Sequence, residues 1–364
     1  MVLSVLVEDK ARLHLDLAPV IKRELDEGMP FYNPVMKHNR DMTIAVLLAY
    51  WHDQDTSTKR VFLPLAASGV RGIRLLQEFS QLDVFMNDIS PSAVAKMQEH
   101  LDENKVNATL SQQSADLFLL QNGAADYIDI DPYGTPNPFL DSAVKKIRNK
   151  GILAVTATDT AALCGSSKRA CLHKYGVVGD NSQFGHEFGV RALIKHVQTI
   201  GAMHEKGLVP IFAYARHHYY RVFFVSRPGK KQVDEQLIQH KYIEPKQNGD
   251  FTLSHYKKKN SLGPIYTGPL CDGNFVKKVH VIAQKHGWND RWLDLYVDEM
   301  SIGGVGYRSI PLIASLYKVA KIAPLEVLES WGCKKTSFYK EGVRIPFSFS
   351  KFVRLLQEYD TMNK

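Results

Sequence analysis

The segment between Arg60 and Asp159 repeats one pattern, in which a short apolar run is followed by a polar or glycine-containing turn and then by an amphipathic stretch. This alternation predicts parallel βαβ units. The expected strands are 61–66, 83–87, 109–113, 126–130 and 152–156, and the expected helices are 70–79, 91–104, 137–150 and 187–206. Ser90 and Pro91 suit the N-cap and first positions of the second helix. We therefore expect an α/β fold built on a mostly parallel sheet.

Two further β runs, 209–215 and 220–226, are separated by a short polar segment and predict a terminal antiparallel hairpin. This ending distinguishes methyltransferase-like sheets from plain dinucleotide-binding folds. The segment SRPGKKQ (226–232) then has the composition of a linker, and short helices broken by glycine and proline follow it. A single core would be unusually large for 364 residues. We expect two domains, 1–228 and 229–364.

The positive charge is unevenly distributed between these domains. Residues 1–228 carry 25 basic and 24 acidic side chains, whereas residues 229–364 carry 21 and 14. A basic appendage indicates a polyanionic partner, because lysine and arginine release counterions from phosphates. A solvated surface is the alternative, for which the run 257–259 would be typical. Aromatic residues interleave KKTSFYKEGVRIPFSFSKF, which resembles the basic hairpin of a winged helix in a small α+β domain. The candidate phosphate contacts are Lys334, Lys335 and Arg344.

Several classes of protein do not fit the sequence. Apolar runs such as 44–51 are far shorter than the roughly 20 residues of a membrane-spanning helix. The N-terminal segment turns charged after seven residues, unlike a signal peptide. Four cysteines without a CxxC pair are expected to be free thiols in a reducing cytoplasm. A mixed zinc site of Cys164, Cys171 and His173 would have unusually wide spacing, so we expect no metal.

The first candidate ligand-binding segment is SGVRGIR, after the first expected strand. Gly69 and Gly72 permit a tight strand-to-helix turn, although a packed turn without a ligand is the alternative. Ala67 replaces the first glycine of a dinucleotide fingerprint, which disfavours pyrophosphate binding. Asp88 ends the next strand, where a carboxylate can accept both ribose hydroxyls of an adenosine or, alternatively, cap a helix. Ser114 follows the third strand and could read an adenine amine.

The motif with the most chemistry is ADYIDIDPYGTP. Asp129 and Asp131 alternate with isoleucines on a strand expected to be buried, which is costly unless the carboxylates are paired or functional. Asp131 and the carbonyl of Pro132 could accept both N–H bonds of an exocyclic amine, and Tyr133 could stack on its base. A proline-glycine turn that caps a helix is the alternative.

These motifs, with MPFYNPVMKHNRDMT, GILAVTATDTAALCG, HEFGVR and YTGPL, occur in the order found in the tRNA guanine-N2 dimethyltransferase family. The chain resembles that family from about Phe31 to Leu270, and its compact length resembles the archaeal members. The resemblance implies a class I methyltransferase fold, S-adenosylmethionine as cofactor, and dimethylation of guanosine 26 of tRNA.

The resemblance also implies residue roles. Arg40 would reach the methionine carboxylate of the cofactor, unless it forms a structural ion pair. The other implied cofactor contacts are Gly69, Arg71, Gly72, Asp88, Ser114 and Ala115. Phe31 and Tyr133 would sandwich the guanine, with Asp131 catalytic, although Phe31 could instead be a core aromatic residue. The chain departs from the family at Leu63 and Ser114, where acidic residues are frequent.

Two rival functions remain open from sequence. One is an adenine-N6 methyltransferase acting on DNA or another RNA, which uses a related D-P-P-Y turn; Tyr133 and Gly134 here argue against it. The other is a non-catalytic RNA-binding protein, which the joint presence of Arg40, Asp88 and Asp131 disfavours. The expected protein is a cytoplasmic enzyme that docks tRNA through its basic domain and shows no obligate protein partner.

Overall fold

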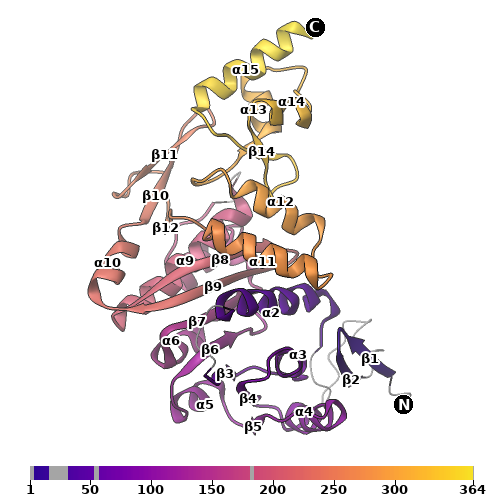
Figure 1. Cartoon of the computed structure of the whole chain (residues 1–364). Coiled ribbons are helices and arrows are strands. Elements are labelled where there is room, and N and C mark those ends of the chain that lie inside the picture. Colours follow the sequence, from indigo (N-terminus) through magenta and orange to yellow (C-terminus); the bar gives the residue numbers. More distant parts are fainter. Residues whose placement is uncertain (1–3, 16–31, 53–56, 181–183, 364) are drawn as a thin grey trace.

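The computed structural model describes residues 4–15, 32–52, 57–180 and 184–363. At its centre is a seven-stranded sheet in the order β5-β4-β3-β6-β7-β9-β8 (Figure 1). Its strands are β3 (Lys59–Leu63), β4 (Leu82–Asn87), β5 (Thr109–Ser111), β6 (Ala125–Ile130), β7 (Ile147–Ala157), β8 (Lys206–Arg216) and β9 (Tyr219–Pro228). Strands β3 to β7 pair in parallel, and β9 pairs antiparallel with both β7 and β8. The predicted parallel sheet with a terminal hairpin is confirmed.

Helices cover both faces of this sheet because successive strand residues point to opposite sides. On β3, Val61 and Leu63 join the hydrophobic cluster of one face, whereas Phe62 joins that of the other. The first cluster includes α2 (Lys37–Trp51), α3 (Val70–Glu78) and α4 (Pro91–Asn104). The second includes α5 (Ala115–Gln121), α6 (Asn137–Lys146), α7 (Thr160–Leu163), α8 (Lys168–Tyr175) and α9 (Gly185–Met203). The sheet is thereby buried on both faces, as its apolar strands require.

The segment after the hairpin continues the same hydrophobic core. Only Gly229 separates β9 from α10 (Lys230–Leu237), so the expected linker is absent. The following elements are β10 (His240–Pro245), β11 (Phe251–Ser254), β12 (Leu262–Tyr266), α11 (Gly273–Lys285) and α12 (Arg291–Glu299). Ile265 of β12 packs in the cluster of α9, and Val279 of α11 packs in that of α2, along which α11 lies (Figure 1). The boundary at 228 stays a prediction, and extensive apolar contacts cross it.

The end of the chain forms a separate small module. Its elements are β13 (Arg308–Ser309), α13 (Ile310–Tyr317), α14 (Leu325–Ser330), β14 (Lys334–Lys335), β15 (Gly342–Arg344) and α15 (Phe349–Met362). It has its own hydrophobic cluster, which includes Ile313, Leu328 and Phe352. Strands β14 and β15 pair antiparallel within the segment expected to form a basic hairpin. Figure 1 shows this module at the end of the molecule opposite to the N-terminal strands.

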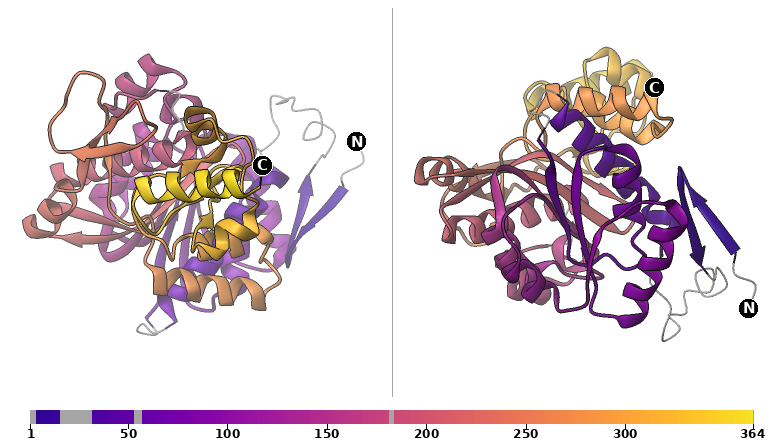
Figure 2. Two further views of the ribbon diagram at one scale, coloured as in Figure 1. Left: turned by 90° about the horizontal axis from the view of Figure 1, so that it is seen from above. Right: turned by 60° about the horizontal axis from the view of Figure 1, so that its bottom comes forward.

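The N-terminal hairpin of β1 (Ser4–Glu8) and β2 (Ala11–Leu15) contacts α3 and α4, as the right view of Figure 2 shows. The short helix η1 (Pro34–Met36) leads into α2. No helix within the described ranges is long and apolar enough to cross a membrane. All four cysteines are free thiols, and burial raises the pKa of Cys171, Cys271 and Cys333 to about 11.

Candidate active site

The loops that follow β3, β4 and β5 lie side by side at the carboxyl edge of the sheet and are joined by hydrogen bonds. The backbone N–H of Ala66 donates to the carbonyl of Asn87 at 2.9 Å. The side-chain amide of Asn87 donates to the carbonyl of Gln113 at 2.9 Å, and the Asp88 N–H donates to the carbonyl of Ser111 at 3.3 Å. The structure therefore brings together the first three motifs that the sequence predicted at one crevice.

Asp88 organises the loop between β4 and α4. Its Oδ2 accepts the N–H of Ala67 at 2.9 Å, and its Oδ1 accepts the N–H of Ser90 at 3.0 Å. Ser90 itself caps α4, so Asp88 is not the capping residue. Each carboxylate oxygen has a second lone pair, and Asp88 can therefore still accept hydroxyl hydrogens from a ligand.

The two glycines of SGVRGIR are required for different structural reasons. Gly69 precedes α3 with φ of 75°, a left-handed conformation that favours glycine. Gly72 lies inside α3 against the sheet, where a Cβ atom would come within 2.2 Å of the Sδ of Met86. Gly69 thus serves the turn and Gly72 the packing of α3 on the sheet, and their proximity to a cofactor stays a prediction.

The third loop begins α5. Ser114 is the N-cap of this helix and accepts the N–H of Leu117 at 3.4 Å, and Ala115 is buried. Two large apolar side chains are unusually exposed here: Ile89, in the loop after β4, at 71% and Leu117, in the first turn of α5, at 45%. Exposed apolar groups beside a carboxylate suit a flat, partly apolar ligand such as adenine. Sequence reasoning missed both residues, although Ile89 directly follows Asp88.

Asp131 leaves the end of β6 beside Arg71 of α3. The Nη2 of Arg71 pairs with Asp131 Oδ2, and its Nε lies 3.2 Å from Asp129 Oδ2. Arg71 also donates to Thr43 Oγ1 at 2.7 Å and to Asn39 Oδ1 at 3.0 Å. Burial opposes ionisation of Arg71, but the charges of Asp129 and Asp131 raise its pKa above the usual value. Arg71 is therefore held as a cation beside the turn that follows β6.

Asp129 is the buried partner of this ion-pair network. Arg221 of β9 donates to Asp129 Oδ1 at 2.7 Å and to Oδ2 at 2.8 Å, and the hydroxyl of Tyr127 donates to Oδ2 at 2.5 Å. Burial alone would raise the pKa of Asp129, but the charges of Arg221 and Arg71 hold it below the usual value. The costly buried carboxylate is thus paired. Sequence reasoning missed Arg221, which was marked by its place within the apolar run YYRVFFV.

The turn after Asp131 is anchored to the end of β7. The N–H of Gly134 donates to Thr158 Oγ1 at 2.6 Å, and the N–H of Thr158 donates to the carbonyl of Gly134 at 2.9 Å. Pro132 is buried, whereas Tyr133 is 88% exposed. A surface aromatic ring next to a carboxylate is suited to stacking on a base. Phe31, the expected second aromatic residue, lies outside the described residues.

Arg40 occupies a different setting from the one the resemblance implies. It is buried, and its Nε donates to Glu8 Oε1 at 2.7 Å while its Nη2 pairs with Oε2. The same nitrogen donates to the carbonyl of Asn33 at 3.2 Å. The guanidinium lies over the ring of Tyr32, 5.1 Å from its centre. The pair with Glu8 is the structural ion pair that the sequence analysis gave as the alternative. Contact of Arg40 with the cofactor stays a prediction.

The three candidate phosphate contacts divide into two groups. Lys334 and Lys335 lie on β14 and are half-buried, with the Nζ of Lys334 2.9 Å from Asp298. Arg344 is only 3% exposed, and it bonds Glu299 at 2.7 Å and Glu187 at 2.9 Å. The expectation that Arg344 contacts phosphate is wrong, because two buried carboxylates occupy its guanidinium.

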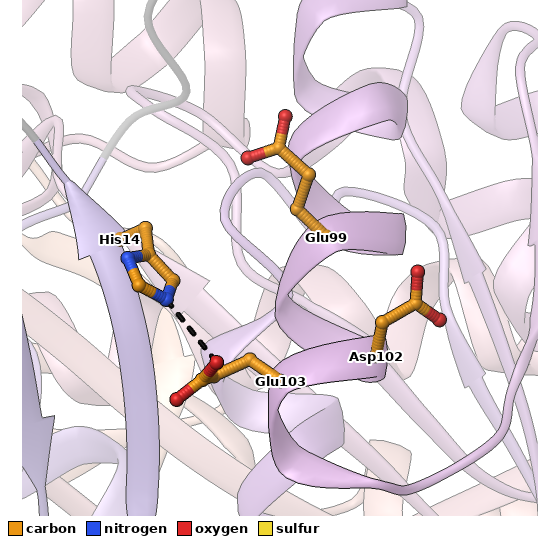
Figure 3. Close-up of a pocket in the computed structure, with 4 residues that line it drawn as sticks. All are labelled: His14, Glu99, Asp102 and Glu103. Carbon is orange, nitrogen blue, oxygen red and sulfur yellow. Dashed lines mark ion pairs between the residues drawn. The ribbon is translucent and has the colours of Figure 1, made fainter.

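A surface hollow of about 530 Å³ lies elsewhere, between β2 and the last turns of α4 (Figure 3). His14, Glu99, Asp102 and Glu103 line it, and His14 Nε2 is 3.4 Å from Glu103 Oε2. Asp88 precedes the opposite end of the same helix, so the hollow does not overlap the strand-end loops. Within the described ranges, no group of three or more histidine, cysteine or acidic residues is arranged to hold a metal.

Comparison with known proteins identifies relatives over nearly the whole chain. A tRNA (guanine(26)-N(2)/guanine(27)-N(2))-dimethyltransferase of Aquifex aeolicus is 32% identical, over 94% of this chain and 93% of its own length. A tRNA (guanine(26)-N(2))-dimethyltransferase of Methanocaldococcus jannaschii is 33% identical over 81% and 82%. The structure of Trm1 from Pyrococcus horikoshii with S-adenosyl-L-methionine matches with a TM-score of 0.87 and 26% identity, over 97% of this chain and 99% of that one.

The family model for N2,N2-dimethylguanosine tRNA methyltransferases matches residues 14–356. This range includes both faces of the sheet, the loops at its carboxyl edge and most of the C-terminal module. The chain therefore belongs to the N2,N2-dimethylguanosine tRNA methyltransferase family.

Proposed function

We propose that this protein transfers two methyl groups from S-adenosylmethionine to the exocyclic N2 of guanosine 26 in tRNA. The family match and the named relatives support this function. The observation that carries it is the set of strand-end loops, where Asp88 and exposed Ile89 lie in one loop while Asp131 and exposed Tyr133 lie in another. A carboxylate beside apolar surface suits a nucleoside cofactor, and a carboxylate beside an aromatic ring suits a base amine.

The residues of the crevice fit the cofactor by their chemistry. Asp88 would accept the ribose hydroxyls, and Ile89 and Leu117 would cover the adenine faces. Arg71 would attract the methionine carboxylate, because its guanidinium is charged and lies at the same edge of the sheet. When bound, S-adenosylmethionine supplies an electrophilic methyl group on a positively charged sulfur.

Asp131 has the central role in activating the substrate. The N2 amine of guanine is a poor nucleophile because its lone pair is delocalised into the base. Among the described residues Asp131 is held at Oδ2, by Arg71, so Oδ1 is the oxygen available to an amine hydrogen. Acceptance of the N–H hydrogens by Asp131 and the Pro132 carbonyl would localise the lone pair toward the methyl group. Asp131 would also take up or relay the proton that leaves N2 when the amine is methylated.

Tyr133 would hold the guanine by stacking on one face. Its exposure leaves the ring accessible to a base that has been turned out of the folded tRNA. The second methyl transfer uses the same groups with one amine hydrogen fewer, so the acceptors must tolerate a monomethylated amine.

The substitution Asp131→Asn tests the catalytic role. It preserves shape but removes the negative charge, so we expect single-turnover methylation to slow by roughly 10²–10⁴-fold. Cofactor affinity, measured by calorimetry, should stay within about threefold if only the acceptor is lost. The matched control is Asp126→Asn on β6, the strand that precedes Asp131; its carboxylate pairs with Arg148 at 2.7 Å. Turnover close to that of the wild type would exclude Asp131 as the acceptor.

Nucleoside analysis after incubation with labelled S-adenosylmethionine separates the rival activities. Dimethylguanosine in a tRNA pool and no methyladenine in a DNA pool is the expected result. A relative named for guanines 26 and 27 also favours a second candidate site at the neighbouring guanosine. A tRNA with adenosine at position 26 should accept no methyl groups under the first reading, whereas residual methylation would support the second.

The substitution Asp88→Ala tests the cofactor site. We expect it to weaken S-adenosylmethionine binding more than tRNA binding, because Asp88 would lose its bonds to the ribose. The control is Ser90→Ala, which removes the cap of α4 but leaves Asp88 in place. An earlier melting temperature with unchanged cofactor affinity in Asp88→Ala would assign the residue to loop structure alone.

A further inference from the structure

A buried series of alternating charges connects the terminal hairpin of the sheet to the turn after β6. Arg221 of β9 pairs with both oxygens of Asp129, and Asp129 Oδ2 lies 3.2 Å from the Nε of Arg71. Arg71 in turn pairs with Asp131. The exposed fraction of the side chain is 0% for Arg221, 2% for Asp129 and 20% for Asp131. Burial therefore increases along the series from Asp131 to Arg221.

Stability alone gives a weak reason for this arrangement. Buried ion pairs lose about as much solvation as they gain in attraction, and well-packed apolar residues often replace them without loss of stability. The Nε of Arg221 is also buried without a partner among the described residues. A buried network of four charged side chains that ends at Asp131, on the turn after β6, points instead to a role in the site.

We propose that Arg221 is a positioning residue for Asp131 that acts through Asp129 and Arg71. This inference rests on the proposed function of Asp131. Arg221 neutralises Asp129, which lies next to Arg71 but too deep to be solvated. Arg71 is thereby left to hold Asp131 at Oδ2, and the positive charge of Arg71 stays beside the turn after β6.

The charge count explains why the arrangement depends on Arg221. Two arginines balance two aspartates in the wild-type network. Without Arg221, Arg71 is the one cation left between them. The guanidinium should then turn toward Asp129, because water can solvate the more exposed Asp131 but cannot reach the buried carboxylate. Asp131 would lose the contact that fixes its orientation.

The substitution Arg221→Met removes the charge and keeps an unbranched apolar side chain. We expect kcat to fall by about 10- to 100-fold while KM for tRNA changes by less than about threefold, because docking of the RNA does not involve this network. Affinity for S-adenosylhomocysteine, measured by calorimetry, should fall by about three- to tenfold, since Arg71 has moved away from the crevice. If Arg221 served stability alone, its substitution would lower the melting temperature without lowering kcat selectively over KM for tRNA.

The rescue variant carries Arg221→Met together with Asp129→Asn. It removes one charge of each sign, so Arg71 can again pair with Asp131, and kcat should return to within about fivefold of the wild type. The variant Arg221→Lys keeps the charge and should stay within about threefold even if Arg221→Met does not fold. Arg148→Met is the matched control, because it breaks the partly exposed pair with Asp126, which lies on β6 outside this network, and it should leave kcat nearly unchanged.

The outcomes separate this inference from the proposed function. Wild-type kcat in Arg221→Met, a double variant as slow as Arg221→Met, or a tenfold loss in Arg221→Lys would each overturn the positioning role. If Asp131→Asn is slow in the same assay, the catalytic assignment stands despite that result. If Asp131→Asn is as fast as the wild type, the proposed function of Asp131 fails first.

Discussion

Glu8 is the residue on which two arginines and a tyrosine converge. Its Oε1 accepts from Arg40 at 2.7 Å and from Arg74 at 2.8 Å, and its Oε2 accepts the hydroxyl of Tyr32 at 2.7 Å. Burial alone would raise the pKa of Glu8, but its bond to Arg40 and the charges of Arg40 and Arg74 lower the pKa from 4.5 to about 2. The carboxylate thus ties the N-terminal hairpin to α2 and α3.

The lowered pKa predicts a pH-dependent contribution to stability. Between pH 4.5 and 2 the unfolded chain binds a proton at Glu8 more readily than the folded chain does. The contribution, up to about 3 kcal/mol, is therefore complete above pH ~5 and is lost as the pH falls toward 2. The difference in the free energy of unfolding between the wild type and Glu8→Gln should be large at pH 7, should fall to roughly half by pH 3 and should be small at pH 2 in urea titrations. An equal difference across these pH values would contradict this origin.

The control is Glu103→Gln, at a partly exposed pair with Arg12. Its free energy of unfolding should differ little from that of the wild type at any of these pH values.

Residue types at the site could be predicted from sequence, but their partners could not. Asp88, Asp131 and Tyr133 were identified because polar or aromatic residues directly follow apolar strands. The environment of the charged residues depends on contacts between distant segments. Arg40 pairs with Glu8, which lies 32 residues away in the sequence, and Arg221 pairs with Asp129, which lies 92 residues away. Arg344 was misassigned for the same reason, since no local pattern reveals that a basic residue faces buried carboxylates.

At the scale of elements, the close approach of α3 to the sheet depends on Gly72. A methyl group there would come within 2.2 Å of Met86 Sδ and 3.1 Å of Leu63 Cδ1, and both side chains are buried. We expect Gly72→Ala to destabilise the protein by about 1–3 kcal/mol through overpacking, an amount partly offset by the better helix propensity of alanine. Displacement of α3 should also weaken cofactor binding, because Arg71 lies on the same turn. Thermal unfolding and calorimetry measure both effects.

The control is Gly185→Ala, at the start of α9, where open space surrounds the glycine, and it should be neutral. An equally neutral Gly72→Ala would disprove the packing argument.

The elements that sequence predicted are those with a regular apolar pattern. The parallel strands and the terminal hairpin have it, and their bounds agree within a few residues in most cases. The helix expected over 137–150 ends at Lys146, because Ile147 already pairs with Ala125 in the sheet. Helix α2 was missed because it is buried on nearly all sides and therefore lacks an amphipathic period. Helix α5 was missed because it spans only seven residues and its cap, Ser114, was interpreted as a ligand contact.

For the whole molecule, the basic C-terminal region (229–364) is joined to the sheet by a buried ion-pair network. Arg344 of β15 bonds Glu187 of α9 and Glu299 of α12. The backbone N–H of Gly306 also donates to Glu187 at 2.8 Å. In addition, α11 covers α2, so a chain cut near 226 would expose apolar surface that is buried in the complete protein. A test of tRNA docking should therefore use the full chain with point substitutions.

We expect the pair Lys334→Glu and Lys335→Glu to weaken tRNA binding through lost phosphate contacts. The logarithm of the binding constant should fall less steeply with the logarithm of salt concentration, by about one unit per lost contact, because fewer counterions are released. The melting temperature should change little, since the pair of Lys334 with Asp298 is partly exposed and worth little. Binding titrations over a range of potassium chloride concentrations measure the slope.

Arg344→Met provides the contrast that separates docking from architecture. It leaves Glu299 and Glu187 with one cation fewer in the interior, so the melting temperature should fall clearly. The buried guanidinium releases no counterions on binding, and the folded fraction should keep the salt slope of the wild type. The opposite pattern, with an unchanged slope after the two lysine substitutions and a flatter one after Arg344→Met, would show that tRNA docks on another surface. It would also show that the module opens at Arg344 when tRNA binds, because only then could this side chain reach a phosphate.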